Sequence, residues 1–149
     1  MTAVPERITP EQRSAVMRAV RGSGTGAEAA FLALRLPWRF REQARELPGI
    51  PDFVQDRFRV AIFIDGDFWH GRWWFERGAA PTVNRRYWMG KFERNRARDT
   101  AAGRKLRARG WAVLRVWESE LRTDPGTVRE LVRRRIAARR RRLDARRRP

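Results

Sequence analysis

Two spacings of apolar residues run along the chain, and each predicts a different kind of element. Short runs rich in Val, Ile, Phe and Trp are typical of strands, whereas apolar residues three or four positions apart are typical of helices. We therefore predict strands at 38–43, 52–54, 58–64 and 111–117. We predict helices at 9–20, 25–36, 84–109 and 127–138.

The second of these helices has a clear start and stop. Thr25 and Glu28 stand at the capping-box spacing, and Pro37 ends the pattern. We expect the helix to send its apolar residues into the core, namely Phe31, Leu32 and Leu34 to Leu36.

The order of the elements predicts the fold class. Two helices, a strand, a hairpin, a long helix, a strand and a last helix indicate an α/β domain whose mixed central sheet is flanked by helices. The second hairpin strand, 58–64, is rich in Val, Ile and Phe, so we expect it to be buried on both faces. The length of 149 residues suits one domain, which we place at 1–132.

Positive charge indicates a polyanionic partner. Lys and Arg number 35 against 17 Asp and Glu, which gives a net charge of +18. Since each phosphate that Lys or Arg neutralises releases counterions, double-stranded DNA is the first candidate. The alternative is an arginine-preferring composition whose charges are solvated and have no partner.

Half of that net charge lies in the arginine-rich helix end and tail, 133–149. This segment holds ten arginines and one aspartate, a charge of +9. A block of like charges of this kind is typically disordered when free, and we expect it to order along a phosphate backbone.

Composition also excludes several classes of site. Without cysteine there is no disulfide, no thiol nucleophile and no Cys-based zinc site. The start of the chain, Met1 to Arg13, is polar, and no apolar run approaches the roughly 18 residues of a membrane span. We expect a cytoplasmic, nucleoid-associated protein with no membrane partner.

Two carboxylates fall at strand ends that a hairpin brings together. Asp52 begins one hairpin strand and Asp65 follows the other. Carboxylate oxygens suit Mg²⁺, which keeps its remaining positions for water and phosphate. The structural alternative is that Asp52 caps a turn and Asp65 belongs to an ordinary Asp-Gly turn.

The only histidine, His70, follows in a glycine-punctuated aromatic loop. Its imidazole can take a proton from water at neutral pH, although a lone histidine is more often structural. Five large rings, in Phe68-Trp69 and Trp73-Trp74-Phe75, lie close in sequence. Those that the core does not need are candidates to stack on bases or wedge between them.

Several ordered motifs resemble those of the very-short-patch mismatch-repair (Vsr) endonucleases. The likeness covers roughly residues 9–132, nearly all of the chain outside the arginine tail. The motifs are Leu47 to Val54, Val60 to Gly71 and Gly110 to Glu118, with Arg13 to Ala19 and Thr25 to Glu28 fitting the family's amino-terminal region.

The resemblance implies a restriction-endonuclease-like fold of the PD-(D/E)xK type and Mg²⁺-dependent nicking of one strand beside a T:G mismatch. By position, Asp52 would be the essential metal ligand and the carbonyl of Ile64 a second one. His70 would be the general base or orient the water. Asp99 would be a further acidic residue near the site, and Glu28 would either support His70 or serve only as a helix cap.

The same resemblance assigns residues to DNA. Met17, Phe68 and Trp69 match residues that intercalate beside the mismatch. Apart from the resemblance, the positive charges of Lys91 and of the arginine tail are expected to hold the DNA backbone, and we group Asn95 with the DNA-binding residues.

The chain departs from the family pattern in two places. The family's zinc ligands correspond here to Asp67, Arg72, Trp74 and Ser119. We therefore expect no structural zinc, with Trp73-Trp74-Phe75 packing in its place. Asp65 stands where the best-known member has a catalytic histidine, so it can ligate Mg²⁺ but leaves the general acid open.

Two other functions remain open at this point. One is a nuclease of the same fold without mismatch preference, and the other is a non-catalytic basic nucleic-acid-binding protein. We expect a monomer. Functional coupling to a DNA cytosine methyltransferase or to mismatch-sensing repair proteins is left open.

Overall fold

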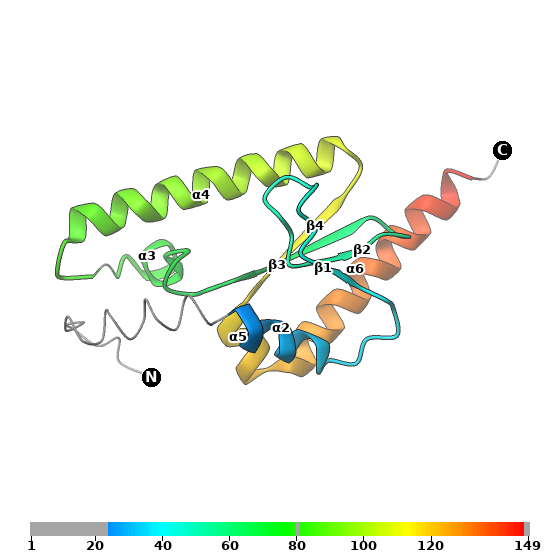
Figure 1. Cartoon of the computed structure of the whole chain (residues 1–149), viewed down its shortest axis with the longest axis horizontal. Helices are drawn as coiled ribbons and strands as arrows, with labels where there is room; N and C mark the ends of the chain where they lie inside the picture. Colours follow the sequence, from blue (N-terminus) through cyan, green and yellow to red (C-terminus); the bar gives the residue numbers. More distant parts are fainter. Residues whose placement is uncertain (1–23, 80, 148–149) are drawn as a thin grey trace.

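The computed structural model describes residues 24–79 and 81–147 (Figure 1). The predicted helix at 9–20, and with it Met17, lies outside the described residues. The elements are α2 (Gly24–Leu32), β1 (Arg41–Glu42), β2 (Phe53–Gln55), β3 (Val60–Asp65), α3 (Arg72–Arg77), α4 (Arg85–Ala108), β4 (Ala112–Trp117), α5 (Glu118–Thr123) and α6 (Pro125–Ala145).

The strands form one mixed sheet in the order β1-β2-β3-β4. The predicted hairpin is confirmed, because β2 and β3 pair antiparallel. Strand β4 runs parallel to β3, with Val60 opposite Ala112 and Asp65 opposite Trp117. Both strands therefore end at the same edge of the sheet, which we call the carboxyl edge.

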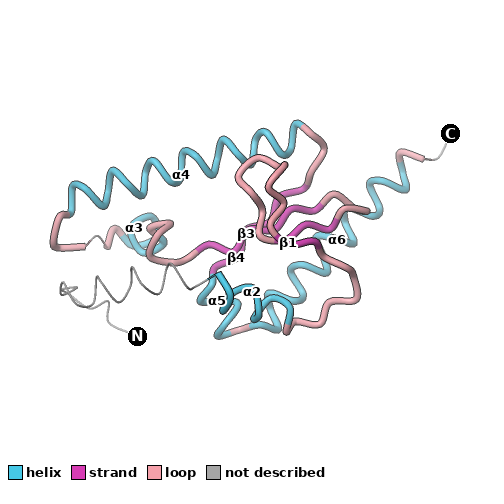
Figure 2. The backbone as a smooth tube through the Cα atoms, viewed as in Figure 1, coloured by secondary structure: helices cyan, strands magenta, loops and turns pink. Residues whose placement is uncertain are grey.

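Helices cover both faces of the sheet, as Figures 1 and 2 show. Helix α4 lies on one side, where Leu106 packs with Ala61, Phe63 and Val113. Helices α2, α5 and α6 lie on the other side, over a second cluster that includes Ile62. The predicted α/β class is confirmed, as is the burial of β3 on both faces. None of the described helices is long and apolar enough to cross a membrane.

Two predicted elements are shorter in the structure. The strand expected at 38–43 is limited to Arg41–Glu42, because its partner β2 has only three residues. Helix α2 ends at Leu32, before a turn in which Arg35 has a φ of 48°. Leu32 is 52% exposed, so our assignment of this residue to the core was wrong, whereas Phe31 and Leu34 are buried.

Three other segments are more helical than predicted, and one of them is the short helix α5, which directly follows β4. Residues 72–77, expected as a loop, form helix α3 between Gly71 and Gly78, which both have positive φ. Helix α6 continues to Ala145 and does not end near Ala138. It is held there by Leu143, which packs against the core cluster, and by the Arg140–Asp144 ion pair. Most of the arginine-rich segment is therefore helix, contrary to the expected disorder.

We predict that Leu106→Ala lowers the free energy of unfolding by roughly 2–5 kcal/mol, because its side chain is fully buried under α4 and truncation leaves a cavity. Urea denaturation measures the loss. The control is Leu131→Ala on α6, where a 40% exposed leucine should cost less than about 1 kcal/mol. Equal losses in the two variants would contradict the assignment of α4 to the core.

Candidate active site at the carboxyl edge of the sheet

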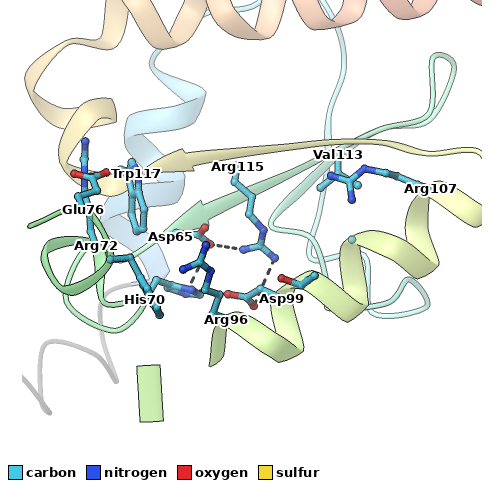
Figure 3. Close-up of a pocket in the computed structure, with 13 residues that line it drawn as sticks. Asp65, His70, Arg72, Glu76, Arg96, Asp99, Arg107, Val113, Arg115 and Trp117 are labelled. Atoms are coloured by element: carbon cyan, nitrogen blue, oxygen red, sulfur yellow. Dashed lines mark hydrogen bonds and ion pairs between the residues drawn. The ribbon is translucent and has the colours of Figure 1, made fainter. Parts of the chain in front are cut away.

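A pocket of about 520 Å³ opens at the carboxyl edge, between the sheet and α4 (Figure 3). Because side chains alternate along a strand, Asp65 and Arg115 point to the face that α4 covers. The pocket is lined by Asp65, His70, Arg72, Phe75, Glu76, Arg96, Asp99, Thr100, Gly103, Arg107, Val113, Arg115 and Trp117.

Four charged or titratable side chains are linked inside this pocket. His70 Nδ1 lies 2.7 Å from Asp99 Oδ2, and His70 Nε2 lies 3.7 Å from Asp65 Oδ1. Arg115 Nη1 donates to Asp65 Oδ1 at 2.7 Å, and its Nη2 lies 3.5 Å from Asp99 Oδ1. Two carboxylates thus share one permanent cation and one imidazole.

The histidine is strongly affected by these neighbours. Burial alone would lower the pKa of His70, but the hydrogen bond to Asp99 and the charges of Asp65 and Asp99 raise it above its ordinary value. For Asp99, burial acts to raise the pKa, yet the contacts with His70 and Arg115 bring it below its ordinary value. The pair therefore favours a protonated ring beside an ionised carboxylate.

Asp52 lies at the start of β2, beside the end of β3. Its Oδ2 accepts a hydrogen bond from the Ile64 backbone N–H at 2.7 Å. Burial raises the pKa of Asp52, and the negative charges of Asp65 and Glu28 add to that effect. The hairpin therefore brings Asp52 and Asp65 within electrostatic reach, as the sequence predicted.

A tight turn before Asp52 fixes its position against α4. Gly49 has a φ of 77°, and a Cβ at this position would lie 2.8 Å from the Ala102 Cβ. Only glycine combines that conformation with so close an approach. Pro51 is fully buried, so the chain enters Asp52 from a fixed direction.

Glu28 has a different partner from the one expected. Its Oε1 accepts a hydrogen bond from Gln43 Nε2 at 2.8 Å, whereas the carboxylate that accepts from His70 is Asp99. The structure thus replaces the expected Glu28–His70 contact by a Glu28–Gln43 contact, and Glu28 affects the site through its charge near Asp52.

The aromatic loop after β3 is held by α4. The Phe68 ring packs edge-on against Trp69, Trp88 and Phe92. Gly71, with a φ of 62°, passes so close that a Cβ there would lie 2.7 Å from Phe92 Cγ. The loop can approach α4 in this way only with glycine at that position.

Two predicted DNA-binding residues also lie on α4 beside this loop. Asn95 Nδ2 donates to the Trp69 carbonyl at 2.9 Å. The Lys91 ammonium lies 4.9 Å from the centre of the Trp69 ring and near Tyr87 and Trp88. These contacts give Asn95 and Lys91 a role in positioning the aromatic loop, and their contacts with DNA stay predictions.

Arg72 is the centre of a polar network at the positions that correspond to the family's zinc ligands. It contacts Asp67 Oδ1 at 3.2 Å, Ser119 Oγ at 3.1 Å and Glu120 Oε1 at 2.8 Å. Asp67 also accepts from the Ser119 hydroxyl at 2.5 Å and from its backbone N–H at 3.0 Å. A guanidinium at the centre of this network does not fit a zinc ion, which needs electron-pair donors.

The expected apolar packing at these positions is therefore wrong. Helix α3, which carries Trp73, Trp74 and Phe75, has no buried residue. Ionic and hydrogen-bonding contacts of Arg72 join α3 to α5 instead, because Asp67 and Ser119 leave polar groups that need partners.

Sequence reasoning missed Arg115 and the role of Arg72. A signal for Arg115 was present, because it is the only polar residue in the apolar run from Trp111 to Trp117. A charge in a strand that is otherwise buried is expected to have a partner. Met17, the remaining predicted site residue, lies outside the described residues.

Comparison with known proteins gives a consistent set of relatives. The family model for the DNA mismatch endonuclease Vsr matches residues 6–76. The chain is 40% identical over 118 residues to the Type II nicking enzyme V.NmeDIP of Neisseria meningitidis serogroup C, covering 78% of this chain and 80% of that protein.

Two further relatives have similar coverage. The Type II nicking enzyme V.XorIIP of Xanthomonas oryzae pv. oryzae is 40% identical over 118 residues, with 78% of this chain and 86% of that protein covered. The DNA mismatch endonuclease Vsr of Escherichia coli K12 is 38% identical over 112 residues, with 74% and 71% covered.

We predict that the His70 imidazole titrates above its ordinary pKa of about 6.5, and that Asp99→Asn lowers its pKa by removing a hydrogen bond and a negative charge. Since there is one histidine, its ring proton resonances in an NMR pH titration report this directly. Asp144→Asn, a change of the same kind far along α6, is the control and should not shift it. An unchanged titration in Asp99→Asn would contradict the pairing.

The same shift predicts how stability depends on pH. A raised pKa means that the folded state binds the proton more tightly than the unfolded chain does. The stabilisation from His70 is therefore full below the ordinary pKa and is lost as the pH rises through the raised value. Urea denaturation across this pH range measures the free energy of unfolding of wild type and of Asp99→Asn. As the pH rises, that free energy should fall less in the variant than in wild type.

We predict that Arg72→Gln lowers the free energy of unfolding by about 1–3 kcal/mol, since Asp67 and Ser119 lose a partner. Arg77→Gln, an exposed position on the same helix, should cost much less. In a buffer that keeps Mg²⁺ in excess, thermal unfolding of the wild type should not change with a zinc-selective chelator. A drop in Tm caused by that chelator would show that zinc, and not Arg72, joins these segments.

Proposed function

This chain belongs to the Vsr family of DNA mismatch endonucleases, and from that premise we propose that it nicks one strand of duplex DNA beside a T:G mismatch by Mg²⁺-dependent hydrolysis. Family membership makes the chain a DNA endonuclease with a restriction-endonuclease-like fold. The mismatch, the single-strand cut and the metal are the proposed part.

The observation that carries this proposal is the convergence of Asp52, Asp65, His70 and Asp99 on the carboxyl edge of the sheet. These residues come from a turn, a strand end, a loop and a helix. Asp65, His70 and Asp99 line the pocket, and Asp52 lies outside its lining but within electrostatic reach of Asp65. Titratable groups gathered at one cleft, some of them with shifted pKa values, are typical of active sites.

The oxygen ligands available at Asp52 suit a hard divalent cation. The pKa of Asp52 is raised because burial and nearby negative charges oppose its ionisation, and a bound cation relieves both effects. Asp52 and the Ile64 carbonyl are the residues that would hold it, and Asp65 would add charge while it remains paired with Arg115. No group of three His, Asp or Glu side chains that could hold a metal occurs among the described residues, so a Mg²⁺ ion at Asp52 would take most of its ligands from water and phosphate.

Bound there, Mg²⁺ would supply charge to neutralise the scissile phosphate and to acidify a water. The other steps belong to protein groups. Asp99 holds His70 Nδ1, so that Nε2 is the nitrogen directed toward Asp65 and the reacting centre. In the neutral ring Nε2 accepts the proton of the attacking water, and in the protonated ring it donates to the leaving oxygen. The raised pKa increases the protonated fraction near neutral pH, which favours the donor role.

The aromatic loop supports recognition of a distorted step in the duplex. Phe68 and Trp69 are only partly buried, and α4 braces them from behind through Trp88 and Phe92. A wedge of this kind enters most easily where pairing is weakest, since unstacking a step costs a few kcal/mol. A T:G mismatch provides such a step, and Lys91 beside Trp69 brings positive charge for the adjacent phosphates.

The single-strand cut is supported by the names of the relatives and by an argument that rests on the predicted monomer. The strands of a duplex run antiparallel, so one asymmetric site in a monomer suits one strand. The relatives of this chain include proteins named as nicking enzymes. A monomeric state, and coupling to a DNA cytosine methyltransferase or to repair proteins, stay predictions.

The test is strand-specific cleavage of end-labelled duplexes with one T:G mismatch in varied flanks, or fully paired, in Mg²⁺ or EDTA. We expect nicking beside the thymine in Mg²⁺ only. Asp52→Asn should lower the rate on the order of a hundredfold or more and largely keep DNA affinity. Asp56→Asn is the matched control, because that exposed carboxylate pairs with Arg41 and lies outside the pocket.

The outcomes separate the alternatives. Equal cutting of the paired duplex would indicate a nuclease of this fold without mismatch preference. Binding without cutting in every context, with no effect of Asp52→Asn, would indicate a non-catalytic DNA-binding protein.

A further inference from the structure

A group of arginines lies at the opposite end of the sheet from the catalytic pocket. Arg59 immediately precedes β3. Arg139 and Arg142 lie in the last turns of α6, and Arg146 is its C-cap residue, so the three follow one another at spacings of three and four residues. We call these four residues the distal arginine cluster. Six residue steps separate Arg59 from Asp65, so the cluster lies about 20 Å from Asp65 along the strand direction.

Backbone carbonyls hold two members of the cluster in place. Arg139 Nε donates to the Phe58 carbonyl at 3.0 Å, and its Nη2 donates to the Gly110 carbonyl. Arg59 Nη1 donates to the Arg109 carbonyl at 3.3 Å. Carbonyls orient these guanidinium groups without neutralising their charge.

The four arginines are close enough to repel one another. Burial lowers the pKa of Arg139, and the positive charges of Arg146, Arg142 and Arg59 lower it further. Of the carboxylates nearby in sequence, Asp144 pairs with Arg140, and Asp56 pairs with Arg41. Among the ion pairs of the described residues, none includes a member of the cluster.

Folding therefore brings uncompensated positive charges together on a fixed helix end, which projects beyond the sheet in Figure 1. Such an arrangement costs free energy in the isolated protein, and an anion with several charges offsets that cost. The rise along the helix axis from Arg139 to Arg146 is about 10 Å, which corresponds to about three base-pair steps of about 3.4 Å along the axis of a DNA duplex.

We propose that the distal arginine cluster is a second DNA-binding site, which contacts backbone phosphates of duplex DNA outside the segment held at the catalytic pocket. DNA is favoured over an acidic protein because the cluster is a row of like charges without an apolar patch at its centre, and because guanidinium groups bind phosphate in a bidentate way. The phosphates come either from the flank of the nicked duplex or from a second duplex.

The choice of DNA as the polyanion rests on the proposed function, but the test does not require nicking. Arg142 and Arg146 are exposed, and they are not the arginines that donate to backbone carbonyls. R142Q/R146Q therefore removes two charges and keeps the hydrogen bonds from Arg59 and Arg139 to the backbone. R133Q/R134Q is the matched control, since it lies on the same helix, removes the same charge and changes residues that pair with Glu130.

Affinity for fully paired duplexes of 12 and 30 base pairs is measured in EDTA over a range of salt. The salt slope is the steepness with which the logarithm of the binding constant falls as the logarithm of the salt concentration rises. For the 30-mer, we expect R142Q/R146Q to reduce this slope by about 2, since each phosphate that an arginine no longer neutralises lowers it by roughly 0.9. The control should retain the wild-type slope. An equal reduction in both variants, or none in R142Q/R146Q with any duplex, would overturn the proposal.

The arms of the experiment identify the source of the phosphates. A reduced slope with the 30-mer alone indicates the flank of the nicked duplex. If wild type brings two differently labelled 12-mers close enough for energy transfer and R142Q/R146Q does not, the phosphates come from a second duplex. The slope for the 30-mer should then still fall by about 2 in R142Q/R146Q. A protein that binds in this way but never nicks a T:G duplex refutes the proposed function alone, whereas one that nicks without any effect of R142Q/R146Q refutes only the second site.

Discussion

The parallel pairing of β3 with β4 is the constraint on which the rest of the site depends. It ends both strands at one edge and sets Asp65 diagonally across from Arg115 on the face that α4 covers. The loop that follows β3 then returns His70 to the same edge, where Asp99 of α4 meets it. Without this pairing, the groups that share charge in the pocket would be spread over three separate elements.

Arginine serves three distinct physical purposes in this chain, beyond the solvated charge that its composition suggests. Arg115 pairs with two carboxylates inside the pocket. Arg72 joins helix α3 to α5 through polar groups that would otherwise lack partners. Arg139 braces the end of the sheet that lies away from the pocket. In each case the planar, multidentate guanidinium suits the geometry in a way that lysine does not.

Periodicity predicted the elements whose burial decides their structure. The hairpin, the buried strand β3 and the long helix α4 followed from apolar spacing alone, and Trp88, Phe92 and Leu106 are buried on α4 as the pattern required. Where tertiary contacts decide, the sequence was insufficient: α6 continues past Ala138 because Leu143 meets the core. The candidate site shows the same limit. Position in the hairpin and its loop, together with the resemblance, indicated Asp52 and His70, whereas the contacts of Glu28, Arg72 and Arg115 depend on distances that no local pattern encodes.

The proposed mechanism depends most on the claim that the metal ion binds at Asp52, beside the end of β3. Anomalous diffraction from crystals of the protein with duplex DNA and Mn²⁺ in place of Mg²⁺ tests this directly. We expect an anomalous peak within about 2.0–2.4 Å of an Asp52 carboxylate oxygen and the Ile64 carbonyl oxygen, next to a DNA phosphate. A peak among Asp67, Arg72 and Ser119, or a DNA phosphate at the carboxyl edge with no metal beside it, would contradict the claim.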